Sequence, residues 1–208
     1  MTEKRFIFVI GFNRCGLTSL AMLFRENGIR CLHHYADDAD TTLGAMISAN
    51  LSSGRPIMAG LQRFTAFLDM GMVTPEIVFE GCKLFWQMHG EHPDSYFILN
   101  TRPVEHWIDS RALLQDGEFA EMYADAFGYD EIKIQHVWRK QYLAHLAEVR
   151  EHFADDGKFL EFNIEEDDPA LISNFLSPDF DVDPADWGHW NATDLEALVV
   201  DDASMGQS

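Results

Sequence analysis

Residues 6–20 constrain the fold of this chain more than any other stretch of the sequence. Five apolar residues that favour β-structure, Phe-Ile-Phe-Val-Ile, lead into a loop bounded by Gly11 and Gly16. A helical pattern of apolar residues begins directly after the loop, and Gly28 is placed to end it. This order predicts a buried strand, a tight loop and a helix. The N–H groups and dipole at the start of that helix form a site for an anion.

The charges in this loop narrow the class of anion. Gly11 and Gly16 are spaced as in a phosphate-binding P-loop, with Thr18 at the hydroxyl position. A nucleoside-triphosphate P-loop carries Lys directly after its second glycine, but Leu17 stands there in this chain. The positive charge lies inside the loop instead, on Arg14. The pattern argues against ATP or GTP hydrolysis and for another phosphorylated ligand.

Strands alternate with helices along the rest of the sequence. A second buried strand is predicted at residues 96–101, followed by a helix through Leu114. The order predicts an α/β, three-layer fold with a mostly parallel central sheet flanked by helices. Periodicity does not decide whether a further strand lies at residues 56–60 or 64–69. The remaining predictions are strands at 29–34 and 158–162 and helices at 42–51, 74–88, 130–153 and 168–176.

A second anion site is predicted where the strand of residues 96–101 ends. Arg102 follows that strand directly, and the carboxyl ends of strands are where open α/β sheets bind ligands. Ser110 comes eight residues later, on the helix that follows. A guanidinium fork and a hydroxyl that converge there suit a phosphate group.

Both sites resemble motifs of the sulfotransferase family. Residues 11–20, Gly-Phe-Asn-Arg-Cys-Gly-Leu-Thr-Ser-Leu, are similar to its 5′-phosphosulfate loop, in the branch with the pattern G-x-x-R-x-G-T-T-S-L. Residues 97–111 resemble its 3′-phosphate motif, with Arg102, Trp107 and Ser110 at matching positions. The likeness extends more loosely from Phe6 to Leu176 and implies a P-loop-like fold. Leu17 departs from the pattern, because it stands where the family carries its first Thr. Either the loop has simply lost one hydroxyl donor, or Leu17 packs into the core.

The resemblance implies that the chain uses 3′-phosphoadenylyl sulfate as sulfuryl donor, without a metal. Arg14 is expected to act in catalysis as well as in binding, by neutralising charge on the leaving group. For the general base, the resemblance favours Asp69, with His33 and His34 as alternatives. The implied donor-binding residues are Gly11, Asn13, Arg14, Cys15, Gly16, Leu17, Thr18, Ser19, Arg102 and Ser110.

Three classes of function remain open on the sequence. The first is a sulfotransferase acting on a hydroxyl or amine of a small or lipid-like acceptor. The second is a nucleotide or nucleoside kinase-like P-loop protein, which the missing Lys opposes. The third is a non-catalytic module that binds 3′-phosphoadenylyl sulfate or its product. A small-molecule acceptor is the expected partner, and the oligomeric state stays open.

Composition limits the partners and the compartment. The formal net charge is −20, and an acidic surface repels nucleic acid and anionic membranes. No apolar run approaches the roughly 20 residues that span a bilayer, and the N-terminus does not read as a signal peptide. We therefore expect a cytoplasmic protein without a transmembrane segment. The three cysteines form no metal-binding pattern, and for Cys15 a backbone role is favoured over a thiolate.

The chain is expected to form one α/β domain over residues 1–178, with an acidic extension over residues 179–208. Disordered segments are poor in aromatic residues, so the cluster around Trp187 and Trp190 is expected to dock on the domain. Residues after Val200 are expected to be disordered. The docked cluster either packs over an apolar patch or, with His189, lines the acceptor pocket.

Overall fold

A five-stranded parallel sheet forms the centre of the molecule in a computed structural model that describes residues 4–35, 41–188 and 190. The strands lie in the order β2-β3-β1-β6-β7, and each neighbouring pair is parallel. The predicted α/β class with a mostly parallel sheet is confirmed. The strands are β1 (Ile7–Val9), β2 (Cys31–His33), β3 (Ala66–Leu68), β6 (Tyr96–Thr101) and β7 (Phe159–Asn163).

The central strand β1 is buried on both faces because its apolar residues alternate between two hydrophobic clusters. Phe6, Phe8 and Ile10 belong to one cluster, and Ile7 and Val9 belong to the other. Successive side chains of a strand point to opposite faces of the sheet, so the two clusters are the two interfaces of a three-layer fold.

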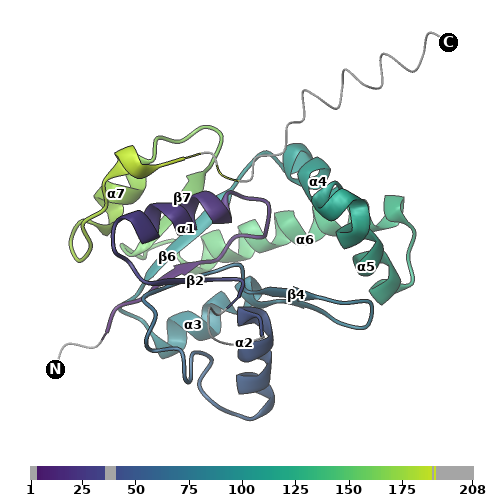
Figure 1. Ribbon diagram of the computed structural model, residues 1–208, viewed down its shortest axis with the longest axis horizontal. Coiled ribbons are helices and arrows are strands. Elements are labelled where there is room, and N and C mark those ends of the chain that lie inside the picture. Colours follow the sequence, from purple (N-terminus) through teal and green to yellow (C-terminus); the bar gives the residue numbers. More distant parts are fainter. Residues whose placement is uncertain (1–3, 36–40, 189, 191–208) are drawn as a thin grey trace, which may run out of the picture.

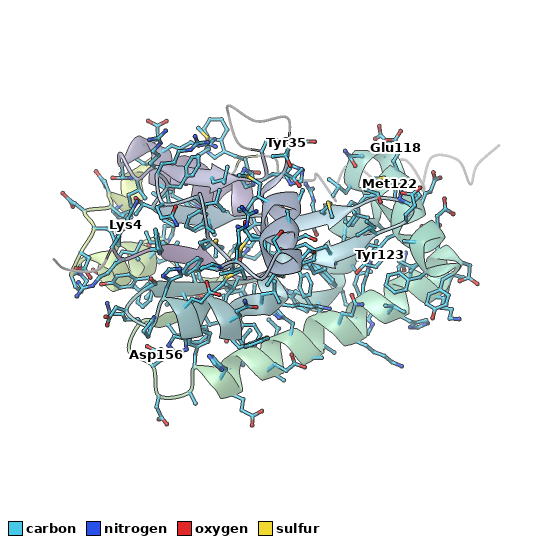
Figure 2. The ribbon with its side chains drawn as sticks, turned by 90° about the horizontal axis from the view of Figure 1, so that it is seen from below. Lys4, Tyr35, Glu118, Met122, Tyr123 and Asp156 are labelled. Atoms are coloured by element: carbon cyan, nitrogen blue, oxygen red, sulfur yellow. The ribbon has the colours of Figure 1, made fainter. Side chains whose placement is uncertain are left out.

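The helices divide between the two faces of the sheet (Figure 1). Helices α1 (Leu17–Glu26) and α7 (Ala170–Leu176) lie together on one face. Figure 2 shows the long helix α6 running along the opposite side of the molecule. The other helices contribute to the cluster that contains Phe6, Phe8 and Ile10. They are α2 (Leu43–Ser52), α3 (Phe85–Glu91), α4 (Val104–Ala112), α5 (Glu118–Phe127) and α6 (Glu131–His152). Short 3₁₀ turns cover Gly81–Leu84, Leu114–Gly117 and Pro184–Asp186.

The strand that periodicity left open is β3, within residues 64–69. Phe67 faces one cluster, whereas Ala66 and Leu68 face the other. Residues 56–60 form turns instead, and the side chain of Asn50 donates hydrogen bonds to the carbonyls of Ile57 (3.0 Å) and Ala59 (3.1 Å). Asn50 thereby satisfies backbone acceptors in a segment without sheet partners.

The helix predicted over residues 74–88 is wrong in its first half. The chain forms an antiparallel hairpin of β4 (Gly71–Val73) and β5 (Val78–Glu80), and the helix starts only at Phe85. Thr74 Oγ1 accepts a hydrogen bond from the N–H of Ile77 at 3.1 Å, inside the hairpin turn. A Thr-Pro pair starts a β-turn as readily as it caps a helix, and the pairing of the two strands decides the outcome.

Helix α5 is an α-helix that the sequence analysis did not predict. Two glycines with left-handed backbone bound it, Gly117 (φ 96°) and Gly128 (φ 64°). Its inner face carries Phe119, Ala120 and Tyr123, which pack into the cluster beside α6. The signal for this helix was local, because an apolar face at helical spacing lies between the two glycines, and the sequence analysis did not use it.

Candidate functional site

The carboxyl ends of all five parallel strands meet at one edge of the sheet and surround a cavity of about 550 Å³. Each strand contributes a side chain at its end to the wall of this cavity. These are His33 as the last residue of β2, Asp69 after β3, Arg14 after β1, Arg102 after β6 and Glu165 after β7. We call it the loop cavity. Ligands of open α/β sheets bind at this edge.

The loop after β1 brings the N-terminus of α1 to the cavity. Arg14 (φ 64°) and Gly16 (φ 74°) both have left-handed backbone, which turns the chain into the helix at Leu17. A Cβ atom on Gly16 would lie 2.8 Å from Ile164 Cγ2, so only glycine fits there. The first intrahelical bond is donated by Leu20 N–H to Gly16 O (3.0 Å), and the N–H groups before it have no partner within the helix. Gly16, Leu17, Thr18 and Ser19 line the cavity.

Asn100 holds both ends of this loop and was not identified from the sequence. Its Oδ1 accepts from Gly11 N–H (2.8 Å), and its Nδ2 donates to Cys15 O (2.7 Å). A Cβ atom on Gly11 would lie 2.1 Å from Asn100 O, which explains the glycine. The signal was present, because Asn100 is a polar residue inside an otherwise apolar buried strand.

Two aromatic residues fix the loop and the end of β6 from the other side. Trp107 Nε1 donates to Asn13 O (2.9 Å), and the Trp107 ring stacks on Tyr142 with centroids 4.4 Å apart. The Tyr142 hydroxyl donates to Arg102 O (2.8 Å) and accepts from Arg102 N–H (3.0 Å). Helices α4 and α6 therefore position the backbone of both predicted phosphate motifs.

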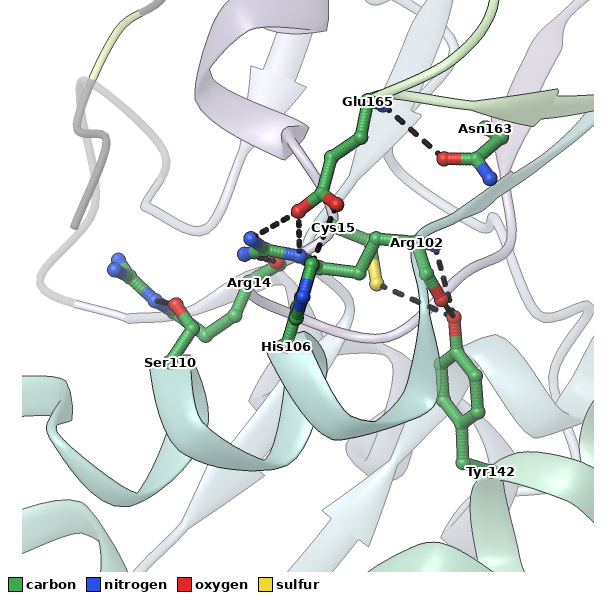
Figure 3. A network of polar contacts seen from close by, with 8 residues as sticks. All are labelled: Arg14, Cys15, Arg102, His106, Ser110, Tyr142, Asn163 and Glu165. Carbon is green, nitrogen blue, oxygen red and sulfur yellow. Dashed lines mark hydrogen bonds and ion pairs between the residues drawn. The ribbon is translucent and has the colours of Figure 1, made fainter. Parts of the chain in front are cut away.

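The two predicted phosphate motifs interlock (Figure 3). Arg14 Nε donates to Ser110 Oγ (2.9 Å), and Arg102 Nη1 donates to Arg14 O (3.1 Å). Burial, and then the nearby charge of Arg102, lowers the pKa of Arg14. Two like charges at a partly buried site are stabilised by an anion placed between them.

Glu165, which the sequence analysis missed, already provides one anionic group. It forms an ion pair with Arg102, accepting from Arg102 Nε at 2.8 Å, and its Oε2 lies 2.7 Å from His106 Nδ1. Burial alone would raise the pKa of Glu165, but the hydrogen bond to His106 and the charge of Arg102 together bring it below its usual value. A phosphate that binds Arg102 must therefore share or displace this carboxylate.

Cys15 and Leu17 belong to the interior. Cys15 is fully buried, and burial raises the pKa of its thiol to about 12, which opposes thiolate chemistry. Leu17 is only 4% exposed and packs in the cluster between α1 and the sheet. Leu17 is thus a core residue and not merely a lost hydroxyl.

The three candidate bases lie together at the cavity. Asp69 Oδ2 is 3.5 Å from His34 Nδ1 and 3.9 Å from His33 Nε2. Asp69 (φ 53°) and His34 (φ 61°) both have left-handed backbone, a strained state for non-glycine residues that often marks functional sites. Burial, with a smaller contribution from the charge of Glu80, raises the pKa of Asp69. Burial, with repulsion from Arg25 and His34, lowers the pKa of His33 to about 4.

Both tryptophans of the C-terminal segment line the loop cavity. The Trp187 ring packs edge-on against Phe162, with centroids 5.6 Å apart. Trp190 N–H donates to Ser19 Oγ (3.1 Å), at the start of α1. His189 and the residues after Val200 lie outside the described residues.

Among the described residues, no group of three or more His, Cys, Asp or Glu side chains is arranged to hold a metal ion. In the same part of the chain, no helix is long and apolar enough to cross a membrane.

Comparisons with known proteins identify the fold. No protein-family model matches the sequence, and a search of curated proteins finds no match either. A sugar kinase from a Janibacter species aligns at 16% identity over 90% of this chain and 100% of its own, with a TM-score of 0.44. A sulfotransferase from Alicyclobacillus acidocaldarius aligns at 14% identity over 98% of this chain and 93% of its own, with a TM-score of 0.50. The chain therefore has a sulfotransferase-like P-loop fold.

Proposed function

We propose that this chain is a sulfotransferase that moves a sulfuryl group from 3′-phosphoadenylyl sulfate to a hydroxyl or amine of a small or lipid-like acceptor. The observation that carries the proposal is the convergence of Arg14, Arg102 and the N-terminus of α1 on one cavity. These groups suit a ligand with two separate phosphates, because each motif supplies its own guanidinium.

The donor supplies an activated sulfuryl group on its 5′-phosphate, and the protein positions it and neutralises charge. The N–H groups at the start of α1, with the Thr18 hydroxyl, hold the 5′-phosphate. Arg14 neutralises the charge that builds on the bridging oxygen as its bond to sulfur breaks. Arg102 binds the 3′-phosphate. Ser110 belongs to the same motif and accepts a hydrogen bond from Arg14 Nε.

The acceptor oxygen or nitrogen forms the new bond to sulfur and gives up its proton. Asp69 takes that proton, because its raised pKa brings its basicity closer to that of a general base working near neutrality. The lowered pKa of His33 makes its imidazole a weaker base, although it lies at the same wall. His34 lies beside Asp69 and orients the carboxylate.

Calorimetric titrations with 3′-phosphoadenosine 5′-phosphate and with adenosine 5′-monophosphate test the donor assignment. These two ligands differ only in the 3′-phosphate. Arg102→Gln should weaken the bisphosphate roughly ten- to a hundredfold, since it removes one charge-assisted contact, and should leave the monophosphate nearly unchanged. Glu165→Gln should tighten the bisphosphate alone, because the competing negative charge is removed.

Equal losses for both nucleotides in Arg102→Gln would contradict the assignment, since they would show that Arg102 acts only through its bond to the loop. Radiolabelled donor tests transfer directly. Turnover of ATP with no turnover of 3′-phosphoadenylyl sulfate would identify a kinase-like protein instead. Tight bisphosphate binding without turnover across an acceptor panel would identify a binding module.

A further inference from the structure

A second cavity, of about 610 Å³, adjoins the loop cavity. The two share Asn13, His34, Asp69 and Leu114 in their walls. A group bound in the second cavity therefore lies next to the carboxylate of Asp69, which also borders the loop cavity. We call this second space the side cavity.

The walls of the side cavity combine an apolar surface with carboxylates. Its apolar part comes from three elements, with Ala45 on α2, Val73 on β4, and Phe119 and Met122 on α5. Figure 2 shows Met122 on α5, on the side of the molecule that also carries Tyr35, another lining residue. An acceptor with an apolar body loses water-exposed surface by packing on these side chains.

The charges of the two cavities differ in sign. Arg14 and Arg102 line the loop cavity, whereas the described residues that line the side cavity include Asp69 and Glu80 and no Lys or Arg. An anion entering the side cavity meets these carboxylates, and the described wall residues offer no Lys or Arg to pair with it. A cationic or neutral molecule meets no such repulsion.

Glu80 is held in place by a buried arginine, Arg111. It forms an ion pair with Arg111, which is fully buried, and the Arg111 guanidinium carbon lies 4.9 Å from the ring centroids of both Trp107 and Trp138. The Glu80 side chain is only 8% exposed, yet it belongs to the cavity wall. A carboxylate fixed in this way contributes to recognition without moving.

We infer that the side cavity is the acceptor site, and that it takes a partly apolar molecule with a hydroxyl or amine, whose remaining charge is neutral or positive. This inference rests on the proposed function. The nucleophilic group points to Asp69 and His34, the apolar body packs on Phe119 and Met122, and anionic acceptors are rejected. The acceptor oxygen or nitrogen attacks the sulfur of the donor where the two cavities meet. The bond from sulfur to the bridging oxygen breaks, and Asp69 receives the proton of the acceptor.

Three phenols of similar size test the inference: tyramine (cationic), 4-ethylphenol (neutral) and 3-(4-hydroxyphenyl)propionate (anionic). Each is titrated calorimetrically into the protein, with and without saturating 3′-phosphoadenosine 5′-phosphate, which gives a non-reacting complex. We expect the cationic phenol to bind at least about tenfold more tightly than the anionic one, as expected for a nearby carboxylate at partial burial.

Met122→Lys is the decisive variant, because Lys has nearly the shape of Met and adds a positive charge to this wall alone. It should reduce the cation-to-anion preference by about tenfold or reverse it. Met122→Leu is the matched neutral control and should keep the preference. The affinity for 3′-phosphoadenosine 5′-phosphate should be equal in all three proteins, since Met122 does not line the loop cavity.

The inference is overturned if the wild-type protein binds the three phenols equally, or if Met122→Lys and Met122→Leu have the same preference. Absence of binding by 3′-phosphoadenosine 5′-phosphate contradicts the proposed function instead. The phenol titrations made without nucleotide then still report whether the side cavity discriminates by charge.

Discussion

At the scale of single residues, Asp69 combines three properties that set it apart from the other acidic residues that the structure describes. It follows a strand end in the walls of both cavities, its backbone is left-handed, and its pKa is raised by burial. Such a backbone costs about 1–3 kcal/mol and persists only where the surrounding structure enforces it. The proposed general base is thus a carboxylate on a backbone segment whose conformation the surrounding structure enforces.

The variant Asp69→Asn tests that role. Asn tolerates left-handed backbone, so the fold and the donor site should be retained. We expect kcat for transfer from 3′-phosphoadenylyl sulfate to fall by about 10²–10⁴-fold, with unchanged affinity for 3′-phosphoadenosine 5′-phosphate. In the wild-type protein, kcat should fall as the pH drops through the raised pKa, because the protonated carboxyl accepts no proton.

His34→Asn is the matched comparison, since His34 has the same backbone conformation and lies next to Asp69. A smaller loss of kcat is expected there, from a less well oriented carboxylate. A full loss in a histidine variant, with kcat retained in Asp69→Asn, would assign the base to the histidine pair.

At the scale of elements, Leu17 is one of the α1 residues that pack the helix of the strand-loop-helix unit against the sheet. Replacement by Thr restores the hydroxyl of the family pattern but removes apolar surface from the core. Because Leu17 is 4% exposed, we expect the free energy of unfolding to fall by up to about 1.5–3 kcal/mol, measured by chemical denaturation.

Leu171→Thr is a suitable control for this change. Leu171 also lies in the first turn of its helix, α7, but is 43% exposed. The same substitution there should change the stability by less than about 0.5 kcal/mol. An unchanged stability in Leu17→Thr, together with tighter binding of 3′-phosphoadenosine 5′-phosphate, would show instead that the hydroxyl position is open to the donor.

At the scale of the whole molecule, buried histidines make the fold sensitive to acid. Burial lowers the pKa of His33 from 6.5 to about 4 and also lowers that of His145, whose Nε2 lies 2.7 Å from the Ile10 carbonyl. Between pH 6.5 and about 4 the unfolded chain binds more protons at His33 than the folded chain. The free energy of unfolding therefore falls as the pH drops through this window.

Chemical denaturation between pH 7.5 and 4 tests this sensitivity. The shift at His33 corresponds to roughly 3 kcal/mol, and Asp69 opposes it because its raised pKa favours the folded state in acid. His33→Asn should flatten the pH dependence. His136→Asn, at an exposed position on α6, is the control for replacing a histidine by asparagine. A stability that stays level or rises toward pH 4 in the wild-type protein would contradict the prediction.

The sequence by itself determined the elements whose signals are local. The strand-loop-helix of residues 6–20, the strand at 96–101 with its Arg102 turn, and the capped helix after Asp130 form as predicted. Each depends on neighbouring residues: a buried apolar run, glycines at a required turn, or a cap that accepts a backbone N–H. The order of strands and helices was also enough to predict a parallel sheet covered on both faces.

The tertiary structure decided everything that depends on partners distant in the sequence. The pairing of β4 with β5 overrode the helix signal at Thr74. The partners of Asn100 and Glu165, and the walls of the side cavity, come from residues distant in the sequence that the fold brings together. The local sequence pattern indicates which residues favour a helix or a strand and which are buried. Which distant residues contact each other depends on the packing of the whole chain.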